Sequence, residues 1–319
     1  MKILLFKILL FTLLVLLSMH FYTQLLNRKG LIPVFSSSSS FDTKLWKYYR
    51  QHQADGVDVL AIGSSLTYYN LNSDIVLKNI PVHSQYYNLS SWHFTTEDLL
   101  KMSYFIKHSV KPKMLIWLDT EYLYKEQAKT KEDKSIPNSL ELSLFDKGFY
   151  EFSYLKSLNL LRMKNRSTQL IKEINSGTKV FGNQSIDNWG GTFIQDNPNF
   201  VEKKHYLPDS SAYQRLNELC KFFEENNIKI IYVNSPYSSF SSKSAQDREN
   251  IVKHAETVKQ IVEASGNIFV DGYSFSGKSD SLFADDGHMN LAGSQWLTTN
   301  IFQNEKVKSL VKTNLENEN

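Results

Sequence analysis

The chain has 319 residues, of which 41% are hydrophobic and 13% aromatic, enough for a packed core and too many for a globally disordered protein. Its 36 basic and 33 acidic side chains nearly cancel and form no dense basic stripe, so we expect no nucleic-acid partner. The single cysteine, Cys220, excludes an intramolecular disulfide, and the absence of zinc-ligand spacings and of phosphate-binding glycine loops predicts neither metal nor cofactor.

The first expected element is an apolar run over residues 3–26, which Lys7 and His20 interrupt. About 20 such residues are enough for one membrane crossing, and Lys7 lies close enough to the end to snorkel. A cleaved secretory signal is the alternative, but no small-residue cleavage site follows the run. We therefore predict a transmembrane signal anchor over residues 1–27. Basic residues stand on both sides of the run, so their distribution is only a weak indication of its orientation. We expect the globular part to be extracytoplasmic.

The serine tract at residues 36–40 predicts a flexible spacer within a linker over residues 28–54. An α/β domain is expected over residues 55–302, followed by a polar, fraying tail at 303–319. Within that domain, residues from about 125 to 210 carry mixed helical patches and a Gly/Asn/Trp-rich loop. We expect them to form an insertion that lies over the sheet.

Short apolar runs and amphipathic patterns alternate through the domain. Expected strands fall at residues 57–62, 82–89, 113–119, 228–234 and 268–271, and expected helices at 72–78, 95–105, 211–226 and 248–265. Strands that alternate with helices predict a parallel, doubly wound sheet.

The first strand leads into the small-residue turn Gly63-Ser64-Ser65. Open α/β folds place their sites at the carboxyl edge of the sheet, and a serine there is available as a nucleophile. A turn without chemistry is an equally good interpretation of this stretch alone. A second stretch, near the other end of the domain, favours the catalytic interpretation.

Asp285 and His288 lie three residues apart, directly before a last expected helix that starts at residues 290–293. At this spacing one short turn can set a carboxylate against an imidazole, which then acts as a general base. Asp286 is the competing choice for the acid. Together the two stretches predict a triad in which Ser65 is the nucleophile, His288 the base and Asp285 the orienting acid.

The order of these motifs resembles the SGNH or GDSL hydrolases. Residues 63–66, Gly-Ser-Ser-Leu, stand where the family carries Gly-Asp-Ser-Leu, and residues 285–293 match its final block. The resemblance implies a flavodoxin-like α/β/α three-layer sandwich with a parallel five-stranded sheet. Ser64 in place of the aspartate is familiar in membrane-anchored relatives that move acyl groups onto cell-envelope polymers.

The family's second block, usually Asn-x-Gly/Ser-x-x-Gly-x-Thr, corresponds to the stretch from Asn88 to Thr95. Ser90 and Thr95 fit it, and His93 occupies the glycine whose backbone N–H helps to form the oxyanion hole. A backbone donor needs no particular side chain. The resemblance thus implies Asn88, Ser90 and His93 as oxyanion or substrate-binding residues.

The third block, usually Gly-x-Asn-Asp, falls on residues 119–122 and offers no amide side chain. Asp119 and Glu121 stand there instead. A carboxylate that faces a developing oxyanion repels it unless protonated, so the sequence predicts an oxyanion hole built differently or an altered activity.

The resemblance implies a membrane-anchored serine esterase or O-acyltransferase that acts on acyl esters of a cell-envelope glycan or polymer. Expected partners are an acylated glycan or small ester substrate, and the membrane through residues 3–26. The alternative is a catalytically inactive carbohydrate-binding or envelope-assembly protein of this fold. In that case Trp92, Trp117 and Trp189 would supply stacking faces, although tryptophans more often anchor cores and loops.

Overall fold

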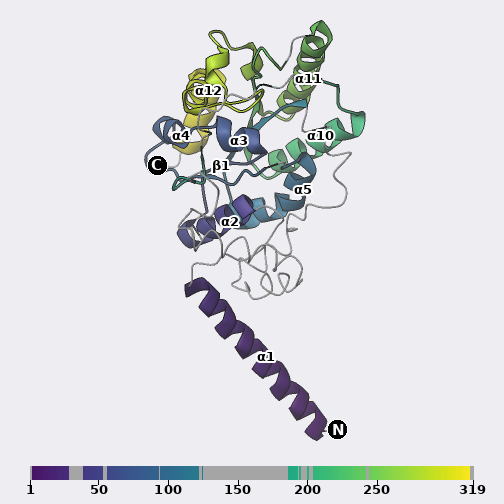
Figure 1. Ribbon diagram of the computed structural model, residues 1–319, viewed down its shortest axis with the longest axis vertical. Coiled ribbons are helices and arrows are strands. Elements are labelled where there is room, and N and C mark those ends of the chain that lie inside the picture. The colour runs from purple at the N-terminus through teal and green to yellow at the C-terminus, as the bar shows by residue number, and fades with distance from the viewer. Residues whose placement is uncertain are drawn as a thin grey trace.

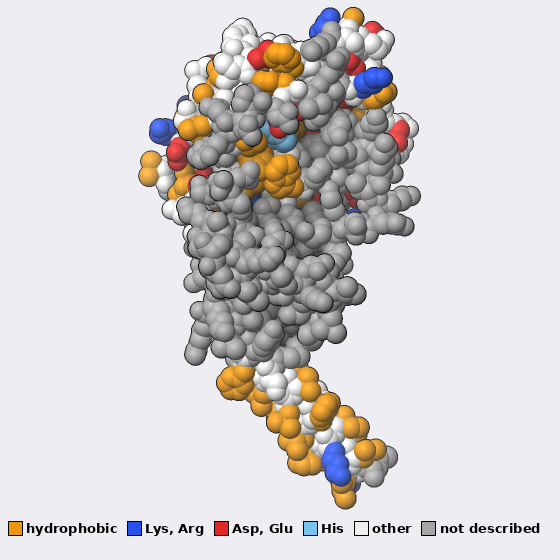
Figure 2. Space-filling model, viewed as in Figure 1, with side chains coloured by type: hydrophobic (Ala, Val, Ile, Leu, Met, Phe, Trp, Pro, Cys, Tyr) orange, Lys and Arg blue, Asp and Glu red, His pale blue; other side chains and the backbone are white. Residues whose placement is uncertain are grey.

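The computed structural model describes residues 2–28, 39–52, 56–92, 94–121, 124, 186–192, 194, 200, 204–241 and 244–316. Helix α1 (Lys2–Arg28) lies at the N-terminus (Figure 1), and its described side chains are largely apolar and exposed (Figure 2). Among the residues searched, which are those that the structure describes, no helix is long and apolar enough to cross a membrane. The anchor over residues 1–27 is therefore not confirmed and stays a prediction.

Five parallel strands form one sheet in the order β2-β1-β3-β5-β6. They are β1 (Val59–Ala61), β2 (Tyr86–Asn88), β3 (Met114–Asp119), β5 (Lys229–Asn234) and β6 (Ile268–Asp271). Ala61 pairs with Asn88 on one side and Ile116 on the other, so the strand order reverses at β1. The expected parallel five-stranded sheet is confirmed. Its described strands have the flavodoxin-like order, and open α/β folds place their sites at the carboxyl ends of the strands where that order reverses, which here is beside β1.

Helices cover both faces of this sheet (Figure 1). One face packs against α2 (Ser39–His52), α5 (Thr96–Phe105) with the π-helical turn η1 (Ile106–Val110), α10 (Ser210–Glu225) and α11 (Ala245–Ala264). The other packs against α3 (Ser65–Asn70), α4 (Ser73–Asn79), α12 (Leu291–Gln303), α13 (Glu305–Val311) and η4 (Lys312–Glu316). The short turns η2 (Gly272–Ser274) and η3 (Asp280–Leu282) lie between β6 and α12.

Residues of β1 alternate between these two layers, as a strand buried on both faces requires. Leu60 belongs to the core on the α2/α5/α10/α11 side, and Val59 and Ala61 belong to the other. Cys220 is buried in the core on the α2/α5/α10/α11 side, and burial raises the pKa of its thiol to about 12.

Two terminal segments differ from the sequence expectation. Helix α2 lies within the stretch expected as a linker, because Phe41, Leu45 and Tyr48 fall on one helical face and are buried in the core. At the other end, α13 and η4 occupy most of the expected fraying tail, held by buried Val307 and Leu315. Most of the expected insertion, about 125–210, lies outside the described residues.

Candidate active site

The turn after β1 is shaped by a glycine and a helix cap. Gly63 has φ +150°, and a Cβ there would lie 2.4 Å from Thr67 Oγ1, so the position excludes larger residues. Ser64 is the N-cap of α3, and its Oγ accepts a hydrogen bond from the Leu66 backbone N–H at 3.2 Å. This cap holds Ser65 as the first residue of α3, at the carboxyl edge of the sheet.

The turn before α12 carries a carboxylate folded back onto its own chain. Asp285 Oδ1 accepts the backbone N–H groups of Gly287 at 2.9 Å and His288 at 2.7 Å, and its Oδ2 lies 2.7 Å from His288 Nδ1. Burial alone would raise the pKa of Asp285, but these hydrogen bonds and the neighbouring imidazole lower it to about 2. An ionised Asp285 favours a proton on Nδ1, which leaves Nε2 as an acceptor.

The two turns meet. His288 Nε2 lies 2.8 Å from Ser65 Oγ, although 223 positions separate the two residues in the sequence. The structure thus brings together all three residues of the expected triad in the nucleophile–base–acid geometry of serine hydrolases. Asp286, the competing acid, instead accepts the Ser238 N–H through its backbone carbonyl at 3.0 Å. Asp285 makes the contact with the imidazole.

Two aromatic rings border the imidazole of His288. Tyr69 meets it edge-on with 5.4 Å between ring centroids, and Trp92 lies at 5.8 Å. Trp92 is 41% exposed, whereas Trp117 is buried in the core and cannot offer a stacking face. Trp189 is half-buried, and its backbone carbonyl accepts the Asn88 N–H. Of the three expected tryptophans, Trp92 is the one beside the site.

Asn88 and Ser90 support the loop after β2 rather than pointing free donors at a substrate. Both are fully buried. Asn88 Oδ1 accepts the Ser90 N–H at 3.1 Å and bonds the Ser90 hydroxyl, and its Nδ2 donates to the Thr67 carbonyl at 3.3 Å. His93, the third expected residue of this block, lies outside the described residues.

A lysine from α2 reaches the same loop. Lys44 is fully buried, its Nζ donates to the Ser90 carbonyl, and the nitrogen lies 3.5 Å from the ring centroid of Tyr68. Burial lowers the pKa of this amine well below its ordinary value, against the opposing effect of nearby Asp187. Helix α2 therefore supports the active-site loop directly.

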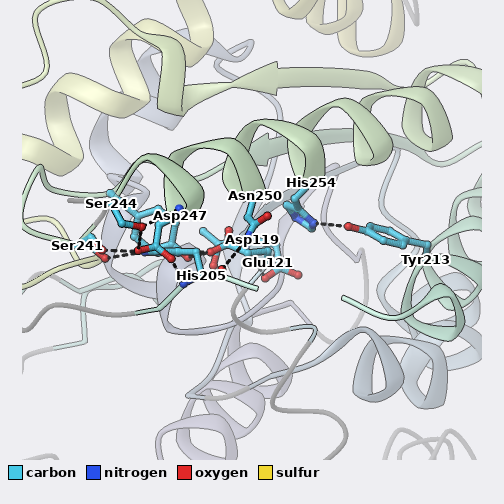
Figure 3. Close-up of polar contacts among 11 residues, drawn as sticks. Asp119, Glu121, His205, Tyr213, Ser241, Ser244, Asp247, Asn250 and His254 are labelled. Carbon is cyan, nitrogen blue, oxygen red and sulfur yellow. Dashed lines mark hydrogen bonds and ion pairs between the residues drawn. The ribbon is translucent and has the colours of Figure 1, made fainter. Parts of the chain in front are cut away.

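The carboxylate of Glu121 takes part in a buried hydrogen-bond network (Figure 3). Glu121 Oε1 accepts from His205 Nδ1 and, at 3.1 Å, from the Tyr237 hydroxyl, while His205 Nε2 lies 3.0 Å from the Ser241 carbonyl. Burial alone would lower the pKa of His205, but the hydrogen bond and charge of Glu121 raise it. Asp119 is buried too, and burial raises its pKa well above the usual range. Glu121 thus pairs with His205 in the interior of the protein.

Sequence reasoning missed four residues around the site: Lys44, Asn70, His205 and Tyr237. Lys44 interrupts a helical apolar pattern, a signal that was present in the sequence. The other three have no local signal, because their partners are distant in the chain. Within the described residues, no group of three or more His, Cys, Asp and Glu side chains could hold a metal ion.

No protein-family model and no curated protein matches this sequence. Solved structures to which the chain is similar include an esterase, an α/β hydrolase and a protein assigned as a lipase. An acetylxylan esterase from Geobacillus stearothermophilus, in a catalytic-mutant form, is 14% identical over 78% of this chain and 93% of its own, with a TM-score of 0.43. An α/β hydrolase from the metagenome of Lake Arreo is 13% identical over 80% and 96%, with a TM-score of 0.43.

A protein assigned as a GDSL-like lipase from Parabacteroides merdae is 12% identical over 80% of this chain and 97% of its own, with a TM-score of 0.38. These values describe a distant likeness in overall arrangement. The side-chain geometry around Ser65, and not this likeness, carries the functional proposal below.

Proposed function

We propose that this chain is a serine esterase or O-acyltransferase that uses Ser65, His288 and Asp285. The observation that carries the proposal is the contact of 2.8 Å between Ser65 Oγ and His288 Nε2, with Asp285 on the opposite ring nitrogen. Ser65 Oγ attacks the ester carbonyl while its proton passes to His288 Nε2. The tetrahedral intermediate collapses as His288 returns the proton to the leaving alkoxide, which leaves an acyl group on Ser65.

The second half-reaction repeats these roles. Water, or a hydroxyl group of an acceptor, attacks the acyl-serine while His288 accepts its proton, and collapse of the second intermediate releases Ser65. Water gives hydrolysis and an acceptor hydroxyl gives acyl transfer. The Ser65 backbone N–H, together with that of His93, is the proposed pair of oxyanion donors.

The proposed substrate is an acyl ester of a cell-envelope glycan or polymer. Two features support this choice: the apolar run over residues 3–26, which would hold the enzyme at a membrane, and the exposed face of Trp92 beside His288. A sugar ring that lies against Trp92 would bring its O-acyl groups towards Ser65.

Kinetics with matched neighbouring variants test the catalytic proposal. Wild type should react with a fluorophosphonate probe and hydrolyse a short-chain acyl ester. Ser65→Ala and His288→Ala should lower kcat by roughly 10³ to 10⁶-fold. Asp285→Asn should lower it by about 10⁴-fold, whereas Asp286→Asn, the matched control, should lose far less.

Labelling that survives Ser65→Ala would refute the nucleophile, and a loss confined to Asp286→Asn would reverse the choice of acid. A wild type that binds acylated glycan but neither labels nor turns over would favour the non-catalytic alternative. Adding a glycan acceptor and following the acyl group separates transfer from hydrolysis, because only transfer yields acylated acceptor.

The membrane orientation has its own test, because the one native cysteine is buried. Lys253 lies on α11 with its side chain 52% exposed, so Lys253→Cys introduces one reactive thiol. In intact cells a membrane-impermeant maleimide should label this variant and leave wild type unlabelled. Labelling that requires cell lysis would place the domain in the cytoplasm and contradict the proposal.

A further inference from the structure

The side chain of Asn70 brackets the proposed catalytic histidine. Its Oδ1 accepts the backbone N–H of Met289 at 2.8 Å, and its Nδ2 donates to the carbonyl of Gly287 at 2.9 Å. These are the residues directly before and after His288. Asn70 is fully buried, and it lies on α3, the helix that begins with Ser65.

These contacts close a ring through the site. The ring runs from Ser65 along α3 to Asn70, across to the backbone on both sides of His288, and back through the imidazole to Ser65. The second N–H of Asn70 donates to Ser235 Oγ at 3.0 Å, and the Ser235 backbone N–H donates to the Asp119 carbonyl at 2.9 Å. One side chain thus joins the nucleophile helix, the histidine turn and the end of β5.

Asp285 does not provide this connection. Its hydrogen bonds to the backbone of Gly287 and His288 and to the imidazole all lie within the same turn. They fix the ring relative to its own turn but not relative to Ser65. Asn70 supplies a direct bond between that turn and the helix that carries the nucleophile.

The chemistry of the position calls for a primary amide. One acceptor must meet the N–H of Met289 while two donors meet the Gly287 carbonyl and the Ser235 hydroxyl. Among side chains of this length only asparagine carries both functions. An aspartate would keep the acceptor but would set an oxygen against the Gly287 carbonyl.

We propose that Asn70 is a positioning residue that sets the distance between His288 Nε2 and Ser65 Oγ. This inference rests on the proposed function of Ser65 and His288. Without the hydrogen bonds of Asn70 to Gly287 and Met289, the turn that carries His288 can shift relative to α3. A displacement of about 1 Å lowers an enzyme's rate by up to about 10²-fold.

The experiment compares Asn70→Ala and Asn70→Asp with Asn72→Ala in the full chain. Asn72 is a matched control, because its side chain accepts the Ile75 N–H as the cap of α4. Labelling of Ser65 by a fluorophosphonate should slow by about 10 to 100-fold in both Asn70 variants and by less than about twofold in Asn72→Ala. Asn70→Asp keeps the size of the side chain and the acceptor for the Met289 N–H, so it provides a second test protein in which only the two donors are lost.

A second readout reports on the histidine turn without catalysis. The Nδ1–H of His288, bonded to Asp285, should give a downfield proton resonance that is absent in His288→Ala. The resonance should shift or broaden in both Asn70 variants and stay in place in Asn72→Ala. Wild-type rates and an unchanged resonance in both Asn70 variants would overturn the inference. An unlabelled wild type would refute the proposed function, and the resonance would still show whether Asn70 sets the turn.

Discussion

Replacing His205 tests the buried pair that His205 forms with Glu121. The side chains of His205 and Glu121 are 1% and 0% exposed, and Glu121 Oε2 has no hydrogen-bond partner among the described residues. In His205→Gln the carboxylate stays buried without its counter-charge, with the Tyr237 hydroxyl on Oε1. Breaking a buried ion pair in this way costs about 3–5 kcal/mol, a large part of the roughly 5–15 kcal/mol that stabilises a domain.

The pH dependence of this loss has a definite sign. The pKa of His205 in the folded state is raised above the ordinary value of 6.5. Its contribution to the free energy of unfolding is therefore complete below pH 6.5 and is lost as the pH rises through the raised pKa. The difference between wild type and His205→Gln should accordingly be larger at about pH 6 than at about pH 9.

Equilibrium urea unfolding at these two pH values measures both effects. Lys306→Gln is the control, because Lys306 forms an exposed pair with Glu263 at 2.9 Å and should contribute below about 1 kcal/mol. The double variant Glu121→Gln/His205→Gln should lose less than the sum of the single losses, since it leaves no buried charge. A His205→Gln loss no larger than that of Lys306→Gln would refute the reasoning.

Three further variants test other parts of the site. Gly63→Ala should destabilise the chain and lower kcat, because the added Cβ would lie 2.4 Å from Thr67 Oγ1 at a φ of +150°; thermal unfolding and ester hydrolysis check it. Burial lowers the pKa of Lys44, so below pH 10.5 the unfolded chain binds a proton that the folded chain does not, and the stability of wild type should rise with pH in this range. Lys44→Met should abolish this rise, and urea midpoints measured across the range check it. The lowered pKa of Asp285, about 2, adds to the free energy of unfolding above pH 3.8, and this contribution is lost as the pH falls towards 2. In Asp285→Asn the free energy of unfolding should therefore fall less steeply with acidification; a pH profile identical to that of wild type would contradict this.

The sheet could be predicted because buried parallel strands appear as short apolar runs between polar and glycine-rich turns. β3 and β5 are examples, with all or nearly all of their residues buried. The meeting of Ser65 with His288 could be predicted as well, since Ser65 follows a predicted strand and Asp285 and His288 have the spacing of one short turn before a predicted helix. The geometry in the structure agrees with that expectation.

The supporting contacts could not be predicted because they depend on tertiary pairing. His205 is 84 positions from Glu121, and nothing near either residue indicates the other. Asn70 is 217 positions from Gly287. Helix α2 is a different case: the serines at its start indicated a spacer, while the spacing of Phe41, Leu45 and Tyr48 already carried the helical face that the core buries.

Detection of the acyl-enzyme is the most direct test of the central claim. Wild type mixed with a short-chain acyl ester and quenched in acid should carry one acyl group, and peptide mass spectrometry should place it on Ser65. His288→Ala should accumulate far less of it over the same time, because Ser65 then has no general base. An acyl group on another residue, or turnover in Ser65→Ala equal to that of wild type, would contradict the account.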